Sequence, residues 1–419
     1  MSMIGSESRT LSVRDIVAGL SLGLAAPGIA VGKAVMAPFL LIALIAILPS
    51  FKSADMRRGF AARLRAPLGL ALCGMFLLWL VSAVFSISFW HSFETVLRTG
   101  ALVLIGLAYS VYLDAVPRAR DLAGRTLIWA TVAVVAFIVL CIYAGDRVAG
   151  FLDAVGGGDW STAQERFKMF GSVTVCLLPV LIYFGFRLGG SAEWAALACV
   201  PLIALQLYAD GVQPGFSGIL GLVGSVGFVA VIAGIGRLAP AVRRFVSAGL
   251  IVAIVAGGIT FFESLPKPPL LEELTDGLPF PDLHRQVIWG FAWNELKASP
   301  VIGVGPNGIS DVPGAKDIIP GMNQEYIPAH PHSWLLEIGA ETGVLGLAAF
   351  VLVLLMLIRR LSIRVISGDP AGWAAVFMMG VFWSSALVNF SIWAAWWIML
   401  FIVLAALLPW REGRHSDGR

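Results

Sequence analysis

Apolar residues form twelve stretches that are long enough, or nearly long enough, to cross about 30 Å of hydrocarbon as helices. Arg9 and Arg14 precede the first stretch as in a secretory signal. A second apolar run follows almost at once, so we interpret the pair as a transmembrane hairpin, although Pro27 shortens its first helix. The stretches are 16–31, 34–49, 67–86, 94–114, 126–144, 170–186, 194–209, 216–235, 245–262, 334–358, 372–389 and 391–409. This pattern predicts an all-α polytopic membrane protein with about 12 transmembrane helices.

Basic residues collect in every second connection, and this asymmetry predicts the orientation in the membrane. Of the 29 Lys and Arg residues, 20 fall on the side that holds both termini, which is therefore expected to be the cytoplasm. The opposite side carries 9 basic residues, 17 of the 26 acidic residues and the two longest loops, 145–169 and 263–333. We expect those two loops to be extracytoplasmic.

The composition agrees with a chain whose solvent is the bilayer. Hydrophobic residues make up 58%, charged residues 13%, and the mean hydropathy is +0.86. A net charge of +3 is too small to indicate nucleic acid, and we expect no nucleic-acid partner. The four cysteines lie inside apolar runs at no metal-ligand spacing, so neither a disulfide framework nor a zinc site is indicated.

The predicted organisation has four parts: helices 1–9 in residues 1–262, a large loop in 263–333, helices 10–12 in 334–410 and a cytoplasmic tail in 411–419. The large loop opens with a Pro-rich, acidic stretch and ends in Gly- and Pro-rich irregular chain. Between them, residues 282–298 are predicted to form an amphipathic helix. Its apolar positions are Leu283, Val287, Ile288, Phe291 and Leu296.

Candidate chemistry concentrates where the large loop enters the tenth stretch, in the segment AHPHSWLLEIGAETGVLG. His332, Glu337 and Glu341 lie there at the mouth of a helix, where ionisable groups are functional candidates. A solvated first turn is the alternative for the two glutamates. His330 and His332 have three interpretations: a metal site with Glu337, hydrogen-bonded loop histidines, or, for His332, a general base or substrate-positioning group.

Two glycine patterns have structural interpretations. Gly339 and Gly343 form a small-xxx-small pair that is typical of close helix packing. The run GVGPNG from Gly303 to Gly308 resembles a nucleotide-binding loop, but no strand and helix flank it. We therefore predict that it is a turn.

Few cations lie on the extracytoplasmic side, so each is informative. Arg166 and Lys168 precede the sixth span, Arg285 opens the amphipathic helix, and Arg98 lies just inside a span. A guanidinium there can bind a phosphate or diphosphate. A snorkelling interfacial side chain or a salt bridge is the alternative for each.

With these residues in place, the chain resembles the O-antigen ligase and O-antigen polymerase superfamily of bacterial surface-polysaccharide enzymes. The resemblance covers the topology of essentially the whole chain, including one large periplasmic loop before the tenth span, an architecture of GT-C-like type. Its most specific motif is His332 followed by Leu336, Glu341, Gly343 and Gly346. A second motif is the pair Arg285 and Trp289 followed by Pro300, Gly303 and Gly305, and a third is Arg166 ahead of a span.

One departure from the family pattern concerns the start of the eighth span. Members commonly carry a Ser-Arg pair there, whereas this chain has Gly215 and Phe216 in GFSGILGL. The asparagine that often follows the family's counterpart of Arg166 is also missing. Arg166, Arg98 or Lys168 would have to replace the absent arginine, or the donor is held differently.

The resemblance implies a metal-independent, inverting glycosyltransferase without a cofactor, embedded in the bacterial inner membrane with its active site facing the periplasm. Its donor would be a glycan on undecaprenyl diphosphate, and its acceptor would be lipid A-core or a growing glycan. His332 and Glu341 would be catalytic, and Arg285, Arg166, Lys168 and Arg98 would bind the diphosphate. His330, Glu337, Gly343 and Trp289 would support the site.

A ligase that joins O-antigen to lipid A-core is the leading interpretation, and a polymerase of O-antigen or exopolysaccharide is the second. Both use the same donor and the same motif, so the sequence does not separate them. A lipid or polysaccharide transporter is the non-enzymatic alternative, but the spans are nearly free of charge, whereas transporters usually place charges in the middle of the membrane. A protein-linked oligosaccharyltransferase of the same superfamily would usually be longer.

Overall fold

The computed structural model describes residues 11–145, 163–209, 216–268, 270 and 282–410, and within these ranges every regular element is a helix. This confirms the predicted all-α membrane class. Short 3-10 helices at Pro27–Ala30, Lys33–Val35, Leu48–Lys52 and Ile309–Asp311 accompany the α-helices. The α-helices are α1 (Val13–Ala25), α2 (Met36–Ile47), α3 (Ala54–Arg65), α4 (Pro67–Val84), α5 (Phe89–Ala115), α6 (Pro117–Ala144), α8 (Ala163–Leu188), α9 (Ser191–Ala209), α10 (Phe216–Gly236), α11 (Pro240–Glu263), α12 (Leu283–Ala298), α13 (Trp334–Ile366), α14 (Pro370–Ser385) and α15 (Ala395–Leu407).

Each of the twelve apolar stretches overlaps a helix, but not all of these helices are long enough to span a membrane alone. Among the described residues, nine helices have the length and hydropathy of a membrane span. The helices α1, α14 and α15 have only 13, 16 and 13 residues, against about 20 needed to cross the hydrocarbon core. The protein is therefore a multi-pass membrane protein, and the number twelve stays a prediction.

Proline at the first helical position marks the start of several helices. Pro67, Pro117, Pro240 and Pro370 each occupy this position in α4, α6, α11 and α14. Proline has no amide hydrogen to leave unpaired there, and its fixed φ suits the first turn. The preceding residue is held out of the helical conformation, so helices can follow one another after very short connections.

The chain divides into two compact units. The first comprises 1–61, 105–214 and 402–419, and the second comprises 62–104 and 215–401. Within the first unit, α1 packs on α2 and α6, and α6 packs on α8 and α9. Glycines allow the close approach: a Cβ on Gly23 would lie 2.5 Å from the carbonyl oxygen of Ala123, and one on Gly124 would lie 2.2 Å from the ring of Phe184.

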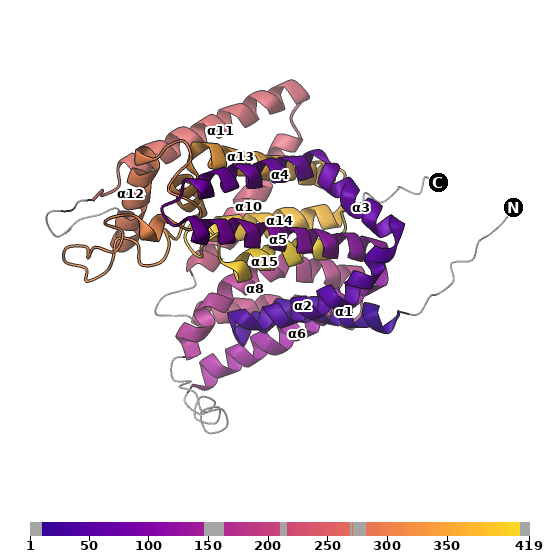
Figure 1. The fold of residues 1–419 in the computed structure, drawn as a ribbon. Coiled ribbons are helices and arrows are strands. Elements are labelled where there is room, and N and C mark those ends of the chain that lie inside the picture. The colour runs from indigo at the N-terminus through magenta and orange to yellow at the C-terminus, as the bar shows by residue number, and fades with distance from the viewer. Residues whose placement is uncertain (1–10, 146–162, 210–215, 269, 271–281, 411–419) are drawn as a thin grey trace. The chain divides into compact units, whose positions relative to one another are not determined.

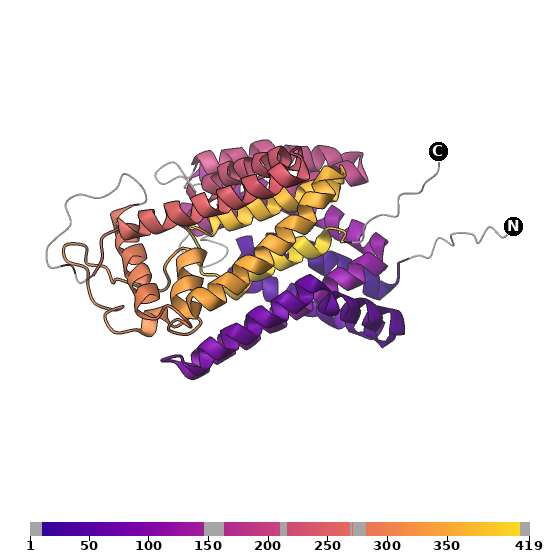
Figure 2. The ribbon, with the colours of Figure 1, turned by 90° about the horizontal axis from the view of Figure 1, so that it is seen from above.

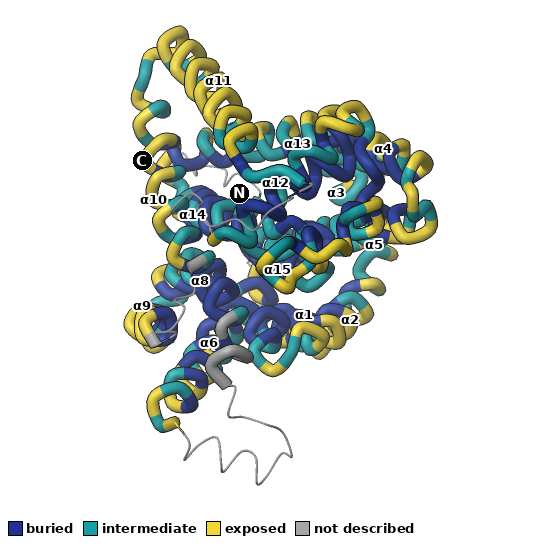
Figure 3. The backbone as a smooth tube through the Cα atoms, turned by 90° about the vertical axis from the view of Figure 1, so that its left-hand side faces the viewer, coloured by how far each residue is buried: buried dark blue, intermediate teal, exposed yellow. Residues whose placement is uncertain are grey.

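The second unit contains all of the candidate site that the structure describes fully. There α13 packs on α4, α12 and α14, and α10 packs on α14. Figures 1 and 2 show α12 lying crosswise to α11 and α13. In Figure 3, α11 is exposed along its length, and none of its residues is buried. This exposure fits a helix whose surface contacts lipid.

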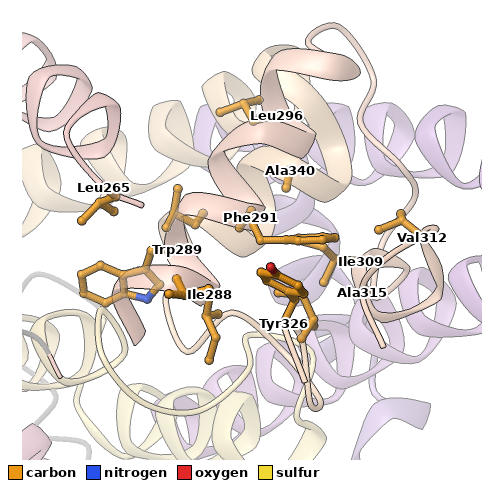
Figure 4. Close-up of a cluster of buried hydrophobic side chains, with 14 of the residues drawn as sticks. Leu265, Ile288, Trp289, Phe291, Leu296, Ile309, Val312, Ala315, Tyr326 and Ala340 are labelled. Carbon is orange, nitrogen blue, oxygen red and sulfur yellow. The ribbon is translucent and has the colours of Figure 1, made fainter. Parts of the chain in front are cut away.

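Helix α12 is the predicted amphipathic helix, and it anchors the irregular chain that follows it. Asp282 caps its first turn by accepting a hydrogen bond from the backbone N–H of Arg285 (3.1 Å). Figure 4 shows Phe291 of α12 facing Tyr326, with ring centroids 5.8 Å apart, and Ile309 beside them. These residues belong to a buried apolar cluster that α12 shares with the segment 299–333 and with Leu336 and Ala340 of α13.

Helix α13 is broken at Gly343, which has φ 64° and ψ −175°. Gly343 allows close packing, as its small-xxx-small pattern predicted, but it packs against the backbone of Val301 at this break rather than within a continuous helix. The turn 300–305 inserts at the break and pairs with the backbone groups that the break leaves free, because buried backbone groups need partners. These bonds run from Val304 N to Ala340 O (3.0 Å), from Gly305 N to Glu341 O (2.8 Å), from Val344 N to Pro300 O (2.8 Å) and from Leu345 N to Val301 O (3.4 Å). The run GVGPNG is thus a turn, as predicted.

We predict that Gly343→Ala destabilises the protein by about 2 to 4 kcal/mol, because a side chain there is both strained and blocked. A Cβ on Gly343 would lie 2.3 Å from the carbonyl carbon and oxygen of Val301. Thermal unfolding in detergent measures the loss. Gly339→Ala is the matched control, since its Cβ would meet only the ends of two leucine side chains, Leu296 at 3.4 Å and Leu347 at 3.6 Å. Equal stability of the two variants would contradict this interpretation of the break.

Candidate functional site

The segment before α13 brings two histidines against one backbone carbonyl. His332 Nδ1 lies 3.2 Å from the carbonyl oxygen of Asn389, and His330 Nε2 lies 3.3 Å from the same oxygen. The two ring centroids are 4.1 Å apart. His332 has φ 55°, which is uncommon for a residue other than glycine and shows that its surroundings hold the backbone in place.

Two tryptophans fix this segment on either side. Trp289 of α12 donates its indole N–H to the carbonyl of Pro331, between the two histidines, at 2.9 Å. The backbone N–H of Trp334 donates to the carbonyl of Ala386 at 3.1 Å. The pairing of the Arg285–Trp289 motif with the histidine motif, which the sequence places 41 or more residues apart, therefore rests on direct contact.

The loop 386–394, which joins α14 to α15, is the part of the site that the sequence interpretation missed. The apolar stretches 372–389 and 391–409 leave one residue between them, whereas helix-to-helix connections usually take 2–8 residues. That shortage, together with the polar Asn389 and Ser391, is the available signal. In the structure α14 ends earlier and α15 begins later than these stretches, and the residues between them face the histidine segment and α13.

Both glutamates of α13 are buried, with 0% exposure for Glu337 and 1% for Glu341, so the alternative of a solvated first turn is wrong for both. Glu337 accepts hydrogen bonds from Ser391 Oγ (2.5 Å) and from the backbone N–H of Ile392 (2.8 Å). Its carboxyl group therefore ties α13 to the loop 386–394.

Glu341 accepts hydrogen bonds from three donors, which belong to two distant segments. Its carboxyl group accepts from the backbone N–H of Asn307 (2.7 Å) and of Ile309 (3.3 Å), and from the indole N–H of Trp393. These contacts fit the interpretation that Glu341 orients neighbouring segments, and its orienting of His332 stays a prediction.

The electrostatic surroundings of His332 keep its imidazole neutral. Burial, the adjacent His330 and the positive charge of Arg285 lower the pKa of His332 to about 4, against an opposing effect of the hydrogen bond to Asn389. His284 lowers it further. His284 lies in the first turn of α12, next to Arg285 in the sequence.

Arg285 keeps its guanidinium available at the first turn of α12. Its one described ion pair is with Asp282 at 3.5 Å, with side-chain exposures of 31% and 58%. A pair this exposed contributes at most about 1 kcal/mol, so a stronger anion can replace it.

The other predicted diphosphate-binding cations are Arg98, Arg166 and Lys168. Arg98 is not among the charges that lower the pKa of His332. Arg98 on α5 pairs with Glu94 (3.2 Å) and reaches the carbonyl of Trp393 (3.4 Å). Arg166 and Lys168 lie in α8, in the first unit, and their side chains are outside the described residues. Their binding of a diphosphate stays a prediction.

A metal site finds no support in the described side chains. Glu337, the third ligand considered with the two histidines, accepts hydrogen bonds from Ser391 and Ile392 through its carboxyl group. Across the described ranges, His, Cys, Asp and Glu residues form no group of three or more that could hold a metal ion.

The start of α10 shows what stands near the absent arginine. The helix begins at Phe216, and the next residue, Ser217, accepts a hydrogen bond from the side-chain amide of Asn389 at 2.9 Å. Three elements, α10, the loop 386–394 and the histidine segment, thus meet through Asn389.

Comparison with known proteins agrees with this geometry. Residues 216–351 match the family model described as O-antigen ligase. Proteins named "Putative polysaccharide ligase" from Rickettsia prowazekii and Rickettsia typhi are each 27% identical to this chain over 135 residues, which is 30% of this chain and 31% of each relative. One from Rickettsia conorii is 26% identical over 118 residues, 27% of this chain and 28% of the relative.

The match therefore spans about a third of the length of these curated relatives. The residues matched by the family model include α10, α12, the irregular segment and the first part of α13, where His332, Arg285, Glu337 and Glu341 lie. The predicted resemblance to the O-antigen ligase family is therefore confirmed over residues 216–351, the segment that carries His332.

Proposed function

We propose that this protein is an O-antigen ligase-like glycosyltransferase. It moves a glycan from undecaprenyl diphosphate to a hydroxyl of lipid A-core at the periplasmic face of the bacterial inner membrane. The observation that carries the proposal is the half-buried, neutral imidazole of His332, whose pKa is lowered in part by the positive charge of Arg285, inside the matched segment.

The reaction needs a cation at the leaving group. As the bond between the sugar C1 and the phosphate oxygen breaks, its electron pair leaves with the diphosphate, whose growing charge must be stabilised. Arg285 can supply two parallel N–H donors to the phosphate oxygens in exchange for its weak contact with Asp282. Arg166, Lys168 and Arg98 are further candidates for the second phosphate.

The reaction also needs a group that takes the acceptor's proton. As the acceptor oxygen bonds to C1, its proton passes to the imidazole of His332, which only the neutral form can accept. Burial and the nearby cations lower the pKa of His332. A bound diphosphate brings negative charge and raises this pKa, which makes the imidazole a stronger base when the donor is present.

The remaining residues have supporting roles in this proposal. Glu337 and Glu341 hold the loops that surround His332, and Trp289 and His330 hold the histidine segment. A single displacement, with the acceptor opposite the leaving diphosphate, inverts the configuration at C1 and uses no metal and no cofactor.

Deletion of the gene, followed by gel analysis of the lipopolysaccharide, tests the proposed function. A ligase predicts loss of all O-antigen on lipid A-core, with lipid-linked polymer accumulating. Core that carries a single repeat unit would instead indicate a polymerase, which uses the same donor. Unchanged lipopolysaccharide would contradict both and point to another polysaccharide.

We predict that Arg285→Ala raises KM for the lipid-diphosphate donor and lowers kcat/KM by about 10- to 100-fold, since it removes a charge-assisted bond of about 1.5 to 3 kcal/mol. Arg285→Lys keeps the charge but not the paired donors, so its loss is intermediate. The steady-state rate against donor concentration measures both. Lys316→Ala, which removes an exposed cation paired with Glu325, is the control. An unchanged KM in Arg285→Ala would contradict the assignment.

A further inference from the structure

We propose that Asn389 is a positioning residue that holds the tautomer of His332, with the proton on Nδ1 and the lone pair on Nε2. This inference rests on the proposed function, because it names the nitrogen that accepts the proton of the acceptor hydroxyl. It concerns a loop residue that the sequence motifs do not contain.

The tautomer follows from the chemistry of the shared partner. A backbone carbonyl oxygen can only accept hydrogen bonds, so each ring nitrogen that faces Asn389 O must carry a hydrogen. A neutral imidazole has one N–H. His332 therefore carries its proton on Nδ1, at 3.2 Å from the oxygen, and Nε2 is left as an acceptor. By the same argument His330 carries its proton on Nε2.

The position of that carbonyl depends on the side chain of the same residue. The Asn389 amide donates to Ser217 Oγ at 2.9 Å and ties the loop to the start of α10. Two and three residues further on, Ser391 and Ile392 tie the loop to Glu337. The Asn389 carbonyl, which contacts both histidines, is thus held in two ways. The side chain of Asn389 bonds Ser217, and the residues after it bond Glu337.

Asn389 is a polar residue in a largely apolar loop, so its side chain needs an explanation. Its neighbours Val388 and Ile392 are buried in apolar clusters, where an amide is costly unless it is hydrogen-bonded. The backbone carbonyl of Asn389 faces two histidines, and its side-chain amide reaches α10. This is the geometry of a positioning residue.

The first test is the ¹⁵N NMR spectrum of histidine-labelled protein in lipid nanodiscs, without substrate. The chain has only five histidines, and His332→Gln identifies the signals of that ring. We expect the shift of a protonated nitrogen for Nδ1 and of an unprotonated nitrogen for Nε2 near pH 7. A ring protonated on Nε2 would overturn the inference, whatever the activity of the protein.

The second test uses the bond between Asn389 and Ser217. Asn389→Ala and Ser217→Ala are each expected to lower kcat by between about 10- and 100-fold, with little change in KM for the donor, since they misplace the base rather than the substrate. Both break the same hydrogen bond, so the double variant should be no slower than Asn389→Ala. In both single variants the NMR signals should show a mixture of His332 tautomers.

Two controls separate positioning from general damage to the fold. Ser217→Thr keeps the accepting hydroxyl and should restore both the rate and the single tautomer. Asn294→Ala removes an amide that contacts the carbonyl of Pro268, and it should change neither. Full activity and an unchanged His332 spectrum in Asn389→Ala would overturn the inference while leaving the proposed function intact. Activity retained by His332 variants would instead contradict the proposed function, so the two failures are distinguishable.

Discussion

His332→Gln is expected to lower kcat for glycan transfer by a factor of about 10² to 10⁴, the usual contribution of a positioned general base. Glutamine retains polarity and approximate size, so it can keep a hydrogen bond to the carbonyl of Asn389 while losing the basic nitrogen. The measurement is the initial rate of transfer by purified protein with a lipid-diphosphate donor. His91→Gln is the matched control, because His91 is exposed and its one hydrogen bond among the described residues is with the side chain of Asn307. Activity of His332→Gln close to that of wild type would contradict the base assignment.

The pH profile gives the same prediction a second readout. Because the pKa of His332 is lowered to about 4, the base is available above that pH and is lost as the pH falls through it. The acid limb of kcat/KM, which reports the free enzyme, should therefore lie near pH 4 rather than near 6.5. The limb of kcat, which reports the donor complex, should lie at higher pH because of the diphosphate charge. His330, Arg285 and His284 are the charged or titratable groups that set this order.

Glu341→Leu is expected to cost about 3 to 6 kcal/mol of unfolding free energy. It leaves the N–H groups of Asn307, Ile309 and Trp393 without their acceptor, and an unsatisfied buried donor costs about 1 to 3 kcal/mol. Glu341→Gln keeps one acceptor oxygen and should lose less.

Unfolding of detergent-solubilised protein, followed by heat or denaturant, measures the Glu341 effect. Glu295→Gln on α12 is the control, because burial raises the pKa of Glu295 and a neutral amide removes the cost of its charge. A loss below about 1 kcal/mol in Glu341→Leu would show that the carboxyl group does not hold the three donors together.

The helices could be predicted from the sequence because their signal is local. A run of apolar residues of sufficient length has few alternatives to a helix in lipid, and the period of α12 is visible in Leu283, Val287 and Phe291. The break in α13 has no such local signal. A glycine at position 343 indicates only that a positive φ is possible there. The contact with the turn at Val301, which lies far away in the sequence, shows that the backbone adopts it.

The site was predictable in part for the same reason. His332, Glu341 and Arg285 stand in motifs that are compact in sequence. Asn389 and the loop around it could not be found in this way, because hydropathy treats VNFSIW as apolar and its partners lie 57 and 172 residues away. Long-range hydrogen bonds leave no periodic trace in a single sequence.

The most direct measurement of the central claim is a two-product assay with purified protein in nanodiscs, an undecaprenyl-diphosphate glycan and lipid A-core. We expect wild type to form glycosylated lipid A-core and free undecaprenyl diphosphate in equal amounts, and His332→Gln to form neither above background. Transfer by His332→Gln at the rate of wild type, or no transfer by folded wild type to any hydroxyl acceptor, would contradict a glycosyltransferase centred on His332.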